Sequence, residues 1–238
     1  MAIDLDLFCF QLSDLEVADW LFEGSIRSLK EEGHLREGVL CASSGIPGPP
    51  EDEALAPDLS REARTARRLR EMLSRTTYVF AFACLEHLLR QCVQEVFKAE
   101  PQRVLAIGDW WRDERLIRQQ IVEGWTRERV VAEVVDAAVH NYDNQPFIKV
   151  PDYFEKRLDI VWRADWRTDL LAVANKRNAA AHDLAYSAPQ REDIETDLRA
   201  VLEHGESIAR AVAARYHLEL RSSVIDEMRH PTTDDDGV

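Results

Sequence analysis

Glycine and proline are scarce in this chain, with nine of each among 238 residues. So few turn-forming residues disfavour an all-β fold of many short strands. No apolar run approaches the roughly 20 residues that a membrane-spanning helix needs. The first residues, MAIDLDLFCF, also lack the basic stretch that opens a secretory signal. We therefore expect no membrane span and a cytoplasmic location.

The four cysteines, Cys9, Cys41, Cys84 and Cys92, include no CxxC pair. Cys84 and Cys92 stand among apolar residues at helical spacing, where reduced core thiols are the ordinary interpretation. The seven histidines are scattered without metal-ligand spacing, and no phosphate-loop, zinc-protease or calcium-loop motif occurs. We expect no disulfide framework, no metal site and no cofactor, with a magnesium site built from carboxylates alone left open.

The net charge of −14 is confined to the periphery of the chain. Residues 1–37 carry −6, and residues 51–58 and 226–238 carry −4 each, so that residues 59–225 are neutral. A neutral body can still present a local basic patch, so an RNA substrate is not excluded. A protein that coats nucleic acid without specificity is disfavoured.

Apolar residues recur at helical spacing through most of the chain, and no segment is a convincing strand. The longest periodic segment runs from Leu59 to about Ala99, with an apolar stripe that includes Met72, Val79 and Phe80. Further helices are expected in four ranges: 4–37, 110–140, 153–182 and 187–216. These patterns predict an all-α bundle of long antiparallel helices.

Composition divides the chain into four parts. An N-terminal helical segment, 1–37, precedes a Gly/Pro-rich acidic linker, 38–58. The main helical domain is expected over 59–225, and an acidic tail, 226–238, is expected to be disordered.

The stretch NKRNAAAHD, residues 175–183, places polar residues around three alanines. At about 100° per residue, Asn178 and His182 share one helix face, and Arg177 lies about 140° from His182 around the axis. One interpretation is close helix packing with an arginine and a solvated histidine at its rim. The other is that two such helices meet and that the polar groups do chemistry.

The stretch RNAAAH resembles the R-x(4–6)-H signature of the HEPN superfamily (higher eukaryotes and prokaryotes nucleotide-binding domains), whose common form has Asn directly after Arg. Arg177, Asn178 and His182 occupy those positions, and the resemblance covers about residues 60–220. It implies a HEPN-like bundle and a metal-independent endoribonuclease, commonly the toxin of a toxin–antitoxin or phage-defence system. It further implies a homodimer whose two motifs share one cleft, with an antitoxin protein as a further partner.

RNA carries its own nucleophile, the 2′-OH, so the chemistry requires neither a metal nor a protein nucleophile. His182 suits general acid–base catalysis because imidazole titrates near neutral pH. Arg177 can clamp the scissile phosphate, and Asn178 can orient a neighbour or the phosphate. The alanines, Ala179 to Ala181, would let two helix ends approach closely.

Two further residues are candidates for support. Glu86 interrupts the apolar face of the long helix, and proteins of the resembling family often have a polar residue on an earlier helix near the motif. An i,i+4 pair with Arg90 is an equal alternative for Glu86. Asp183 could fix the tautomer of the imidazole, although a surface or capping role is the stronger expectation.

A second function stays open beside the nuclease: a catalytically inactive HEPN-like module for interaction or nucleotide binding. The intact Arg–Asn–His set favours the nuclease, and the peripheral acidity weakly favours the inactive module.

Overall fold

The computed structural model describes residues 2–31, 59–105, 124, 126–182, 189 and 191–223. Helix makes up 85% of the interpretable residues, which confirms the predicted all-α class. The predicted linker, 38–58, and the predicted tail, 226–238, lie outside the described residues.

In chain order the described elements are β1 (Ala2–Asp4), α1 (Leu5–Glu31), α3 (Leu59–Ala99), α4 (Pro101–Leu105), α6 (Arg127–Asp143), the 3-10 helix η3 (Phe147–Lys149), α7 (Val150–Leu158), α8 (Ala164–His182), α9 (Arg191–Tyr216) and β2 (Glu219–Arg221). α3 spans the range that its periodicity predicts. The segment 153–182, expected to form one or two helices, is divided because Asp159 adopts the left-handed conformation, with φ 48°, at the end of α7.

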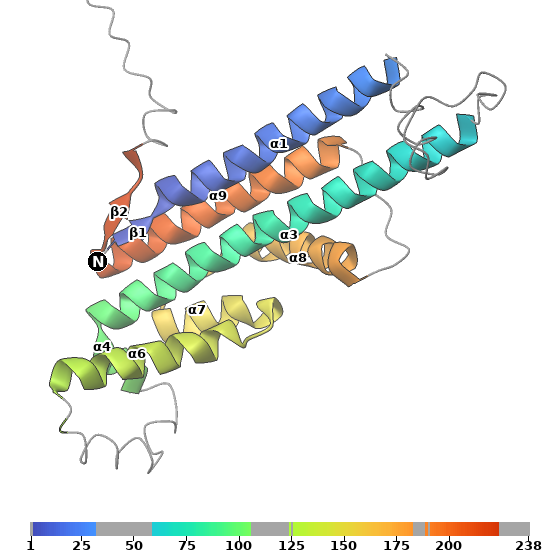
Figure 1. The fold of residues 1–238 in the computed structure, drawn as a ribbon. Coiled ribbons are helices and arrows are strands. Elements are labelled where there is room, and N and C mark those ends of the chain that lie inside the picture. Colours follow the sequence, from blue (N-terminus) through green and yellow to red (C-terminus); the bar gives the residue numbers. More distant parts are fainter. Residues whose placement is uncertain are drawn as a thin grey trace, which may run out of the picture.

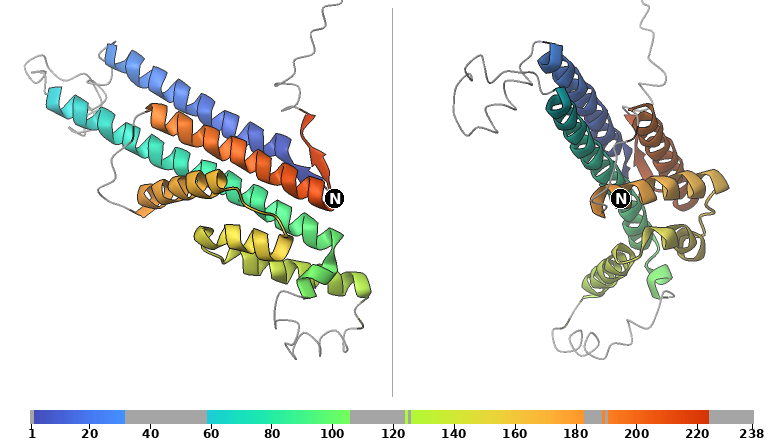
Figure 2. Two further views of the ribbon diagram at one scale, coloured as in Figure 1. Left: turned by 180° about the vertical axis from the view of Figure 1, so that it is seen from behind. Right: turned by 90° about the vertical axis from the view of Figure 1, so that its right-hand side faces the viewer.

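α3 is the central helix of the molecule and contacts α1, α9, α8 and α6 (Figure 1). α1 and α9 lie along it, while α8 and α6 pack against other parts of its surface, as both views of Figure 2 show. None of the described helices has a stretch long and apolar enough to cross a membrane.

The direction of the helices differs in part from the predicted antiparallel order. α1 runs antiparallel to α3, but α9 runs in the same direction as α3 (Figure 1). The contacts agree, since Tyr78 on α3 bonds to Asp197 on α9, and Leu85, further along α3, lies beside Gly205. The segment from α4 to α8 returns the chain and thereby allows the parallel pair.

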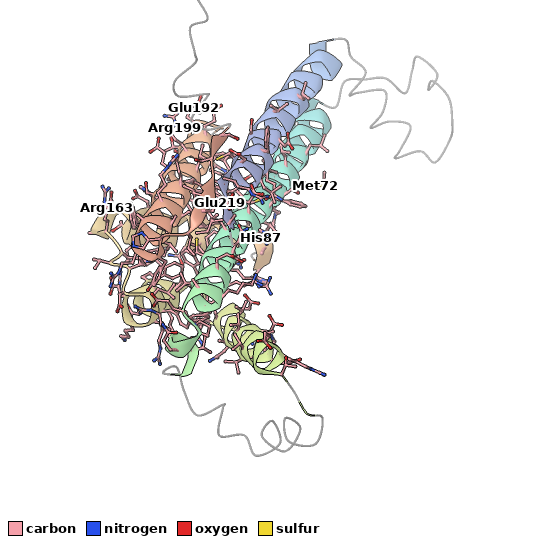
Figure 3. All side chains as sticks on the ribbon, turned by 90° about the vertical axis from the view of Figure 1, so that its left-hand side faces the viewer. Met72, His87, Arg163, Glu192, Arg199 and Glu219 are labelled. Carbon is pink, nitrogen blue, oxygen red and sulfur yellow. The ribbon has the colours of Figure 1, made fainter. Side chains whose placement is uncertain are left out.

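The core forms on one side of α3, where Phe82, Leu85 and Leu89 are fully buried. The predicted apolar stripe of this helix is wrong at its edge, because Met72 and Phe80 are each 56% exposed and Val79 is 40% exposed. Met72 is labelled at the surface in Figure 3. Val79 and Phe80 lie about 100° and 200° around the helix axis from the buried Tyr78, so the predicted stripe was wider than the face that α3 buries.

Two short strands, β1 and β2, form a parallel pair that the sequence did not predict. Three residues are too few for the alternation that identifies a strand. The amide of Asp4 donates to Oε1 of Gln91 (3.2 Å), and Nε2 of Gln91 donates to the carbonyl of Ala2 (3.3 Å), so the pair is attached to α3.

Gly205 allows α9 to approach α1 closely. A Cβ at this position would lie 2.8 Å from Cζ of Phe8 and 3.3 Å from Cδ1 of Leu85. The ring of Phe8, which is 2% exposed, occupies that space instead. The N-terminal helix therefore packs into the same core as α3 and α9.

Candidate functional site

α8 carries the RNAAAH stretch at its C-terminal end and packs against α3 and α9. Its buried residues lie on one face: Trp166, Leu170, Val173, Ala174 and Ala180. Ala180 is 1% exposed within the single chain. It is therefore unavailable to the dimer interface that was expected to include all three alanines, whereas Ala181 is exposed and Ala179 is half-buried.

Arg177 reaches from α8 to α3. Its Nη2 donates to Oε1 of Glu86 at 2.7 Å, although the two residues are 91 positions apart in sequence. Its Nη1 donates to Oδ1 of Asn178 at 3.1 Å, and its guanidinium carbon lies 4.7 Å from the centre of the Phe82 ring. A carboxylate and an aromatic face together orient the guanidinium, whose side chain remains 27% exposed.

Of the two alternatives for Glu86, the structure contains the pair with Arg177. The other predicted partner, Arg90, instead binds Asp143 at the end of α6, with Nε 2.9 Å from Oδ2. Burial raises the pKa of the Glu86 carboxyl, the charge of Arg177 opposes this, and the charge of Asp143 adds to it. The Glu86 side chain is nevertheless 47% exposed, so its pair with Arg177 is a partly solvated one.

His182 is the last residue of α8 and is exposed. It makes no hydrogen bond or ion pair with any residue that the structure describes, Arg177 and Glu86 included. Asp183 lies outside the described residues. Three of the five predicted site residues thus lie together, Arg177, Asn178 and Glu86, and His182 stands apart at the helix end.

A polar contact between three helices fixes the rotation of α8. Nζ of Lys176 lies 2.8 and 2.6 Å from the two carboxylate oxygens of Asp197, and the hydroxyl of Tyr78 donates to the same carboxylate at 2.5 Å. Asp197 is only 9% exposed, so it needs these partners. Because successive residues lie about 100° apart around a helix, holding Lys176 toward α9 turns Arg177 toward α3.

The last turn of α8 is also attached to α3. Nη1 of Arg75 donates to the carbonyl oxygen of Ala180 at 2.7 Å. This carbonyl belongs to the final turn, whose acceptors have no partner within the helix. The position of His182, two residues further on, is therefore set through the backbone of α8.

A cavity of about 250 Å³ opens beside Glu86, at the junction of α3, α6 and η3. Its walls include Glu86, Arg90, Tyr142, Asp143, Gln145 and Phe147. His87, labelled on α3 in Figure 3, lines it as well. The Phe147 ring packs edge-on against Phe82 with centroids 4.7 Å apart, and Phe82 in turn lies under the guanidinium of Arg177. Glu86 likewise lines the cavity and contacts Arg177.

Sequence reasoning missed the cavity because residues 141–152, NYDNQPFIKVPD, lie between the helices expected at 110–140 and 153–182, and no site was expected there. Two aromatic residues, a carboxylate and amides within this short segment are the signal that could have found it. Their partners on α3 could not be identified from one sequence, since the contacts join positions more than 50 residues apart, such as Arg90 and Asp143.

Comparisons of the chain with protein-family models, with curated proteins and with solved structures found no match. Among the described residues, no group of three or more His, Cys, Asp or Glu side chains is arranged to hold a metal ion. The chemistry of the site is therefore interpreted from the contacts of its own residues.

Proposed function

We propose that the protein is a HEPN-like endoribonuclease that cleaves RNA by attack of the 2′-OH, with Arg177 and His182 as the essential pair and Asn178 in support. The observation that carries the proposal is the presentation of Arg177. Its guanidinium is oriented by Glu86 and Phe82, and the side chain is still 27% exposed, so that a phosphate can reach it.

The Arg177–Glu86 contact suggests how a phosphate binds. A carboxylate oxygen 2.7 Å from Nη2 occupies the kind of position that a phosphate oxygen takes in an arginine complex. The scissile phosphate binds the guanidinium of Arg177, either in place of Glu86 or beside it. The raised pKa of Glu86 means that the charged form of this carboxylate is incompletely stabilised in its position. Asn178 then holds the other side of the guanidinium through Nη1.

His182 supplies the proton transfers in this proposal. Its exposed position at the end of α8 leaves the imidazole accessible to a substrate. Cleavage needs a base for the 2′-OH and an acid for the leaving 5′-oxygen. Two copies of the chain, arranged about a twofold axis with their α8 ends in one cleft, supply both from two His182 side chains. The exposed Ala181 is the alanine that such an interface uses.

Within this proposal the enzyme acts in the cytoplasm as the toxin of a toxin–antitoxin or phage-defence system, and a protein antitoxin is its further partner. The neutral charge of residues 59–225 is compatible with selective RNA binding and disfavours indiscriminate coating.

One observation favours a second candidate, the catalytically inactive module for interaction or nucleotide binding. An arginine already paired with a carboxylate on another helix also serves as a structural bridge between α8 and α3. Such a bridge requires no histidine at position 182, whereas the nuclease does. The effect of changing His182 therefore distinguishes the two candidates.

The test is cleavage of a single-stranded RNA by the purified protein in excess EDTA, with analysis of the product ends. The nuclease proposal expects cleavage to persist and the products to carry a 2′,3′-cyclic phosphate and a 5′-OH. RNA with 2′-O-methyl at the scissile position, and DNA, should resist. A 5′-phosphate product, or activity that requires added Mg²⁺, would refute the mechanism.

A further inference from the structure

The cavity beside Glu86 has walls suited to a neutral ligand. Its two carboxylates are each paired with an arginine, Glu86 with Arg177 and Asp143 with Arg90. A phosphate would have to compete with both acids at once. A neutral, flat ligand can enter without breaking either pair.

The wall of the cavity offers both hydrogen-bond acceptors and donors, from Glu86, Asp143 and Gln145 and from Arg90 and His87. Oε2 of Glu86, Oδ1 of Asp143 and Oε1 of Gln145 accept no hydrogen bond from any residue in the described part of the chain. The guanidinium of Arg90 uses only Nε in its bond to Asp143, so its terminal nitrogens remain to donate. A matching ligand presents several N–H donors and one or two acceptors on the same edge.

The volume of the cavity and the aromatic residues in its wall further restrict the kind of ligand that it can bind. Pockets for drug-sized molecules hold about 300–1,000 Å³, so a cavity of about 250 Å³ suits a single heterocycle. Both Phe147 and Tyr142 form part of the wall, but Tyr142 is only 6% exposed. The half-buried Phe147 is therefore the ring that a base can contact, and aromatic side chains are the usual stacking partners of unpaired nucleobases in RNA recognition.

We propose that this cavity binds an unpaired guanine of the RNA next to the phosphate held by Arg177, a role that rests on the proposed nuclease function. Guanine presents N1–H and N2–H₂ together, which match the carboxylate and amide oxygens, and O6 on the same edge accepts from Arg90. Uracil has only one N–H on its edge and can therefore donate to only one of these acceptor oxygens at a time. Glu86 joins the two subsites, since it contacts Arg177 and lines the cavity.

The test uses guanosine, which carries no phosphate, so that binding reports on the cavity and not on Arg177 or His182. Titration followed by NMR or calorimetry should show guanosine binding at least about 10-fold more tightly than uridine, because several hydrogen bonds are lost with uridine. Gln145→Ala and Asp143→Asn should each weaken guanosine binding about 5- to 10-fold. Equal affinity for guanosine and uridine would overturn the proposal.

Two exposed positions outside the cavity provide matched controls. Gln102→Ala on α4 and Asp136→Asn on α6 make the same changes of side chain and should leave guanosine affinity unchanged. Melting curves of all four variants should superimpose on the wild type within a few degrees, because each changed side chain is at least partly exposed. Affinity that falls equally in the controls would contradict the assignment.

Mapping the cleavage sites on a mixed-sequence RNA separates the two proposals. Guanosine binding without RNA cleavage would refute the nuclease and leave the guanine site standing. Cleavage without guanosine binding, at sites unrelated to guanine, would refute the guanine site and leave the nuclease standing. Cleavage beside guanine, with a preference that falls about 5- to 10-fold in Gln145→Ala, is the expected result.

Discussion

The two ends of the RNAAAH stretch are held very differently. Arg177 is attached to α3 by a carboxylate and an aromatic ring, and its neighbour Lys176 is attached to α9 by Asp197. Five residues later His182 is exposed at the helix end and has no partner within the described residues. One end of the motif is thus completed by the single chain, and the other is available to something outside it.

This difference matches the two chemical tasks of the proposed nuclease. A charge clamp acts through preorganisation, because a fixed guanidinium need not reorganise when charge develops on a phosphate. A general acid or base must reach the reacting atoms, and its partners are supplied by the substrate or by a second copy. The contrast predicts that variants at the two ends have similar effects on cleavage but different effects on folding.

The largest expected effect is on cleavage. His182→Ala and Arg177→Ala should each lower the rate of RNA cleavage by about 10²-fold or more, because one removes a proton-transfer group and the other a charge clamp. Initial rates on a labelled single-stranded RNA measure this. Arg199→Ala, an exposed arginine labelled on α9 in Figure 3, is the matched control and should retain full activity. Near wild-type rates in both motif variants would place the site elsewhere.

The second expected effect is on fold stability, and it distinguishes Ala180 from Ala181, which lie between Arg177 and His182. Ala180→Leu should destabilise the fold by about 1–3 kcal/mol, because the added atoms must enter a packed contact that is 1% exposed. Ala181→Leu, one residue on and exposed, should leave the free energy of unfolding unchanged. Urea denaturation at a fixed, low protein concentration measures both. Equal losses in the two variants would mean that Ala180 is less enclosed than its burial indicates.

Ala181→Leu serves a further purpose, since it tests assembly without disturbing the core. If two α8 ends meet, the leucine should weaken the dimer and lower the cleavage rate together. Light scattering beside the activity assay checks this, and a stable dimer with unchanged activity would place the interface on another face.

The third effect is on stability at the arginine end. Arg177→Ala should cost about 1 kcal/mol, because a partly exposed ion pair contributes about 0–1 kcal/mol and a cation–π contact at an exposed site about 0.5–1 kcal/mol. His182→Ala removes no contact with the described residues and should leave the unfolding midpoint unchanged. Thermal and urea denaturation of the two variants provide the comparison. A midpoint that falls more for His182→Ala would reverse the assignment of the two ends.

Much of this architecture could be predicted from the sequence. Periodicity identified the helical class and the full extent of α3, because a long apolar repeat without glycine or proline has few alternatives. The placement of Glu86 near the motif came from the family resemblance and was only one of two interpretations. The choice between Arg90 and Arg177 as partner depends on how α8 crosses α3, and no local pattern encodes that crossing.

The cavity and the parallel α3–α9 pair lay beyond sequence reasoning for the same reason. Residues 141–152 have a loop-like composition. Whether they line a cavity depends on which helix packs beside them, and in the structure that helix is α3. The direction of α9 depends on how many helices intervene before it returns to α3. Ala180 and Ala181 lie about 100° apart around the axis of α8. The bond between Lys176 and Asp197 fixes the rotation of α8 and therefore determines which of the two alanines is buried.

The smallest expected effect concerns the pH dependence of Glu86. Folding raises the pKa of this carboxyl above its ordinary value of 4.5, with burial as the largest cause and Arg177 opposing it. A group of this kind binds its proton more tightly in the folded state, so its contribution to stability falls as pH rises from about 4.5 through the raised pKa. Glu86→Gln removes this titration, and wild type should therefore lose stability relative to the variant across that interval. Urea denaturation at several pH values from about 4 to 7 measures the difference, with the exposed Glu133→Gln on α6 as control. The opposite slope would mean that the attraction of Arg177 outweighs burial, and Glu86 would then act as a firm counterion that a phosphate could not readily displace.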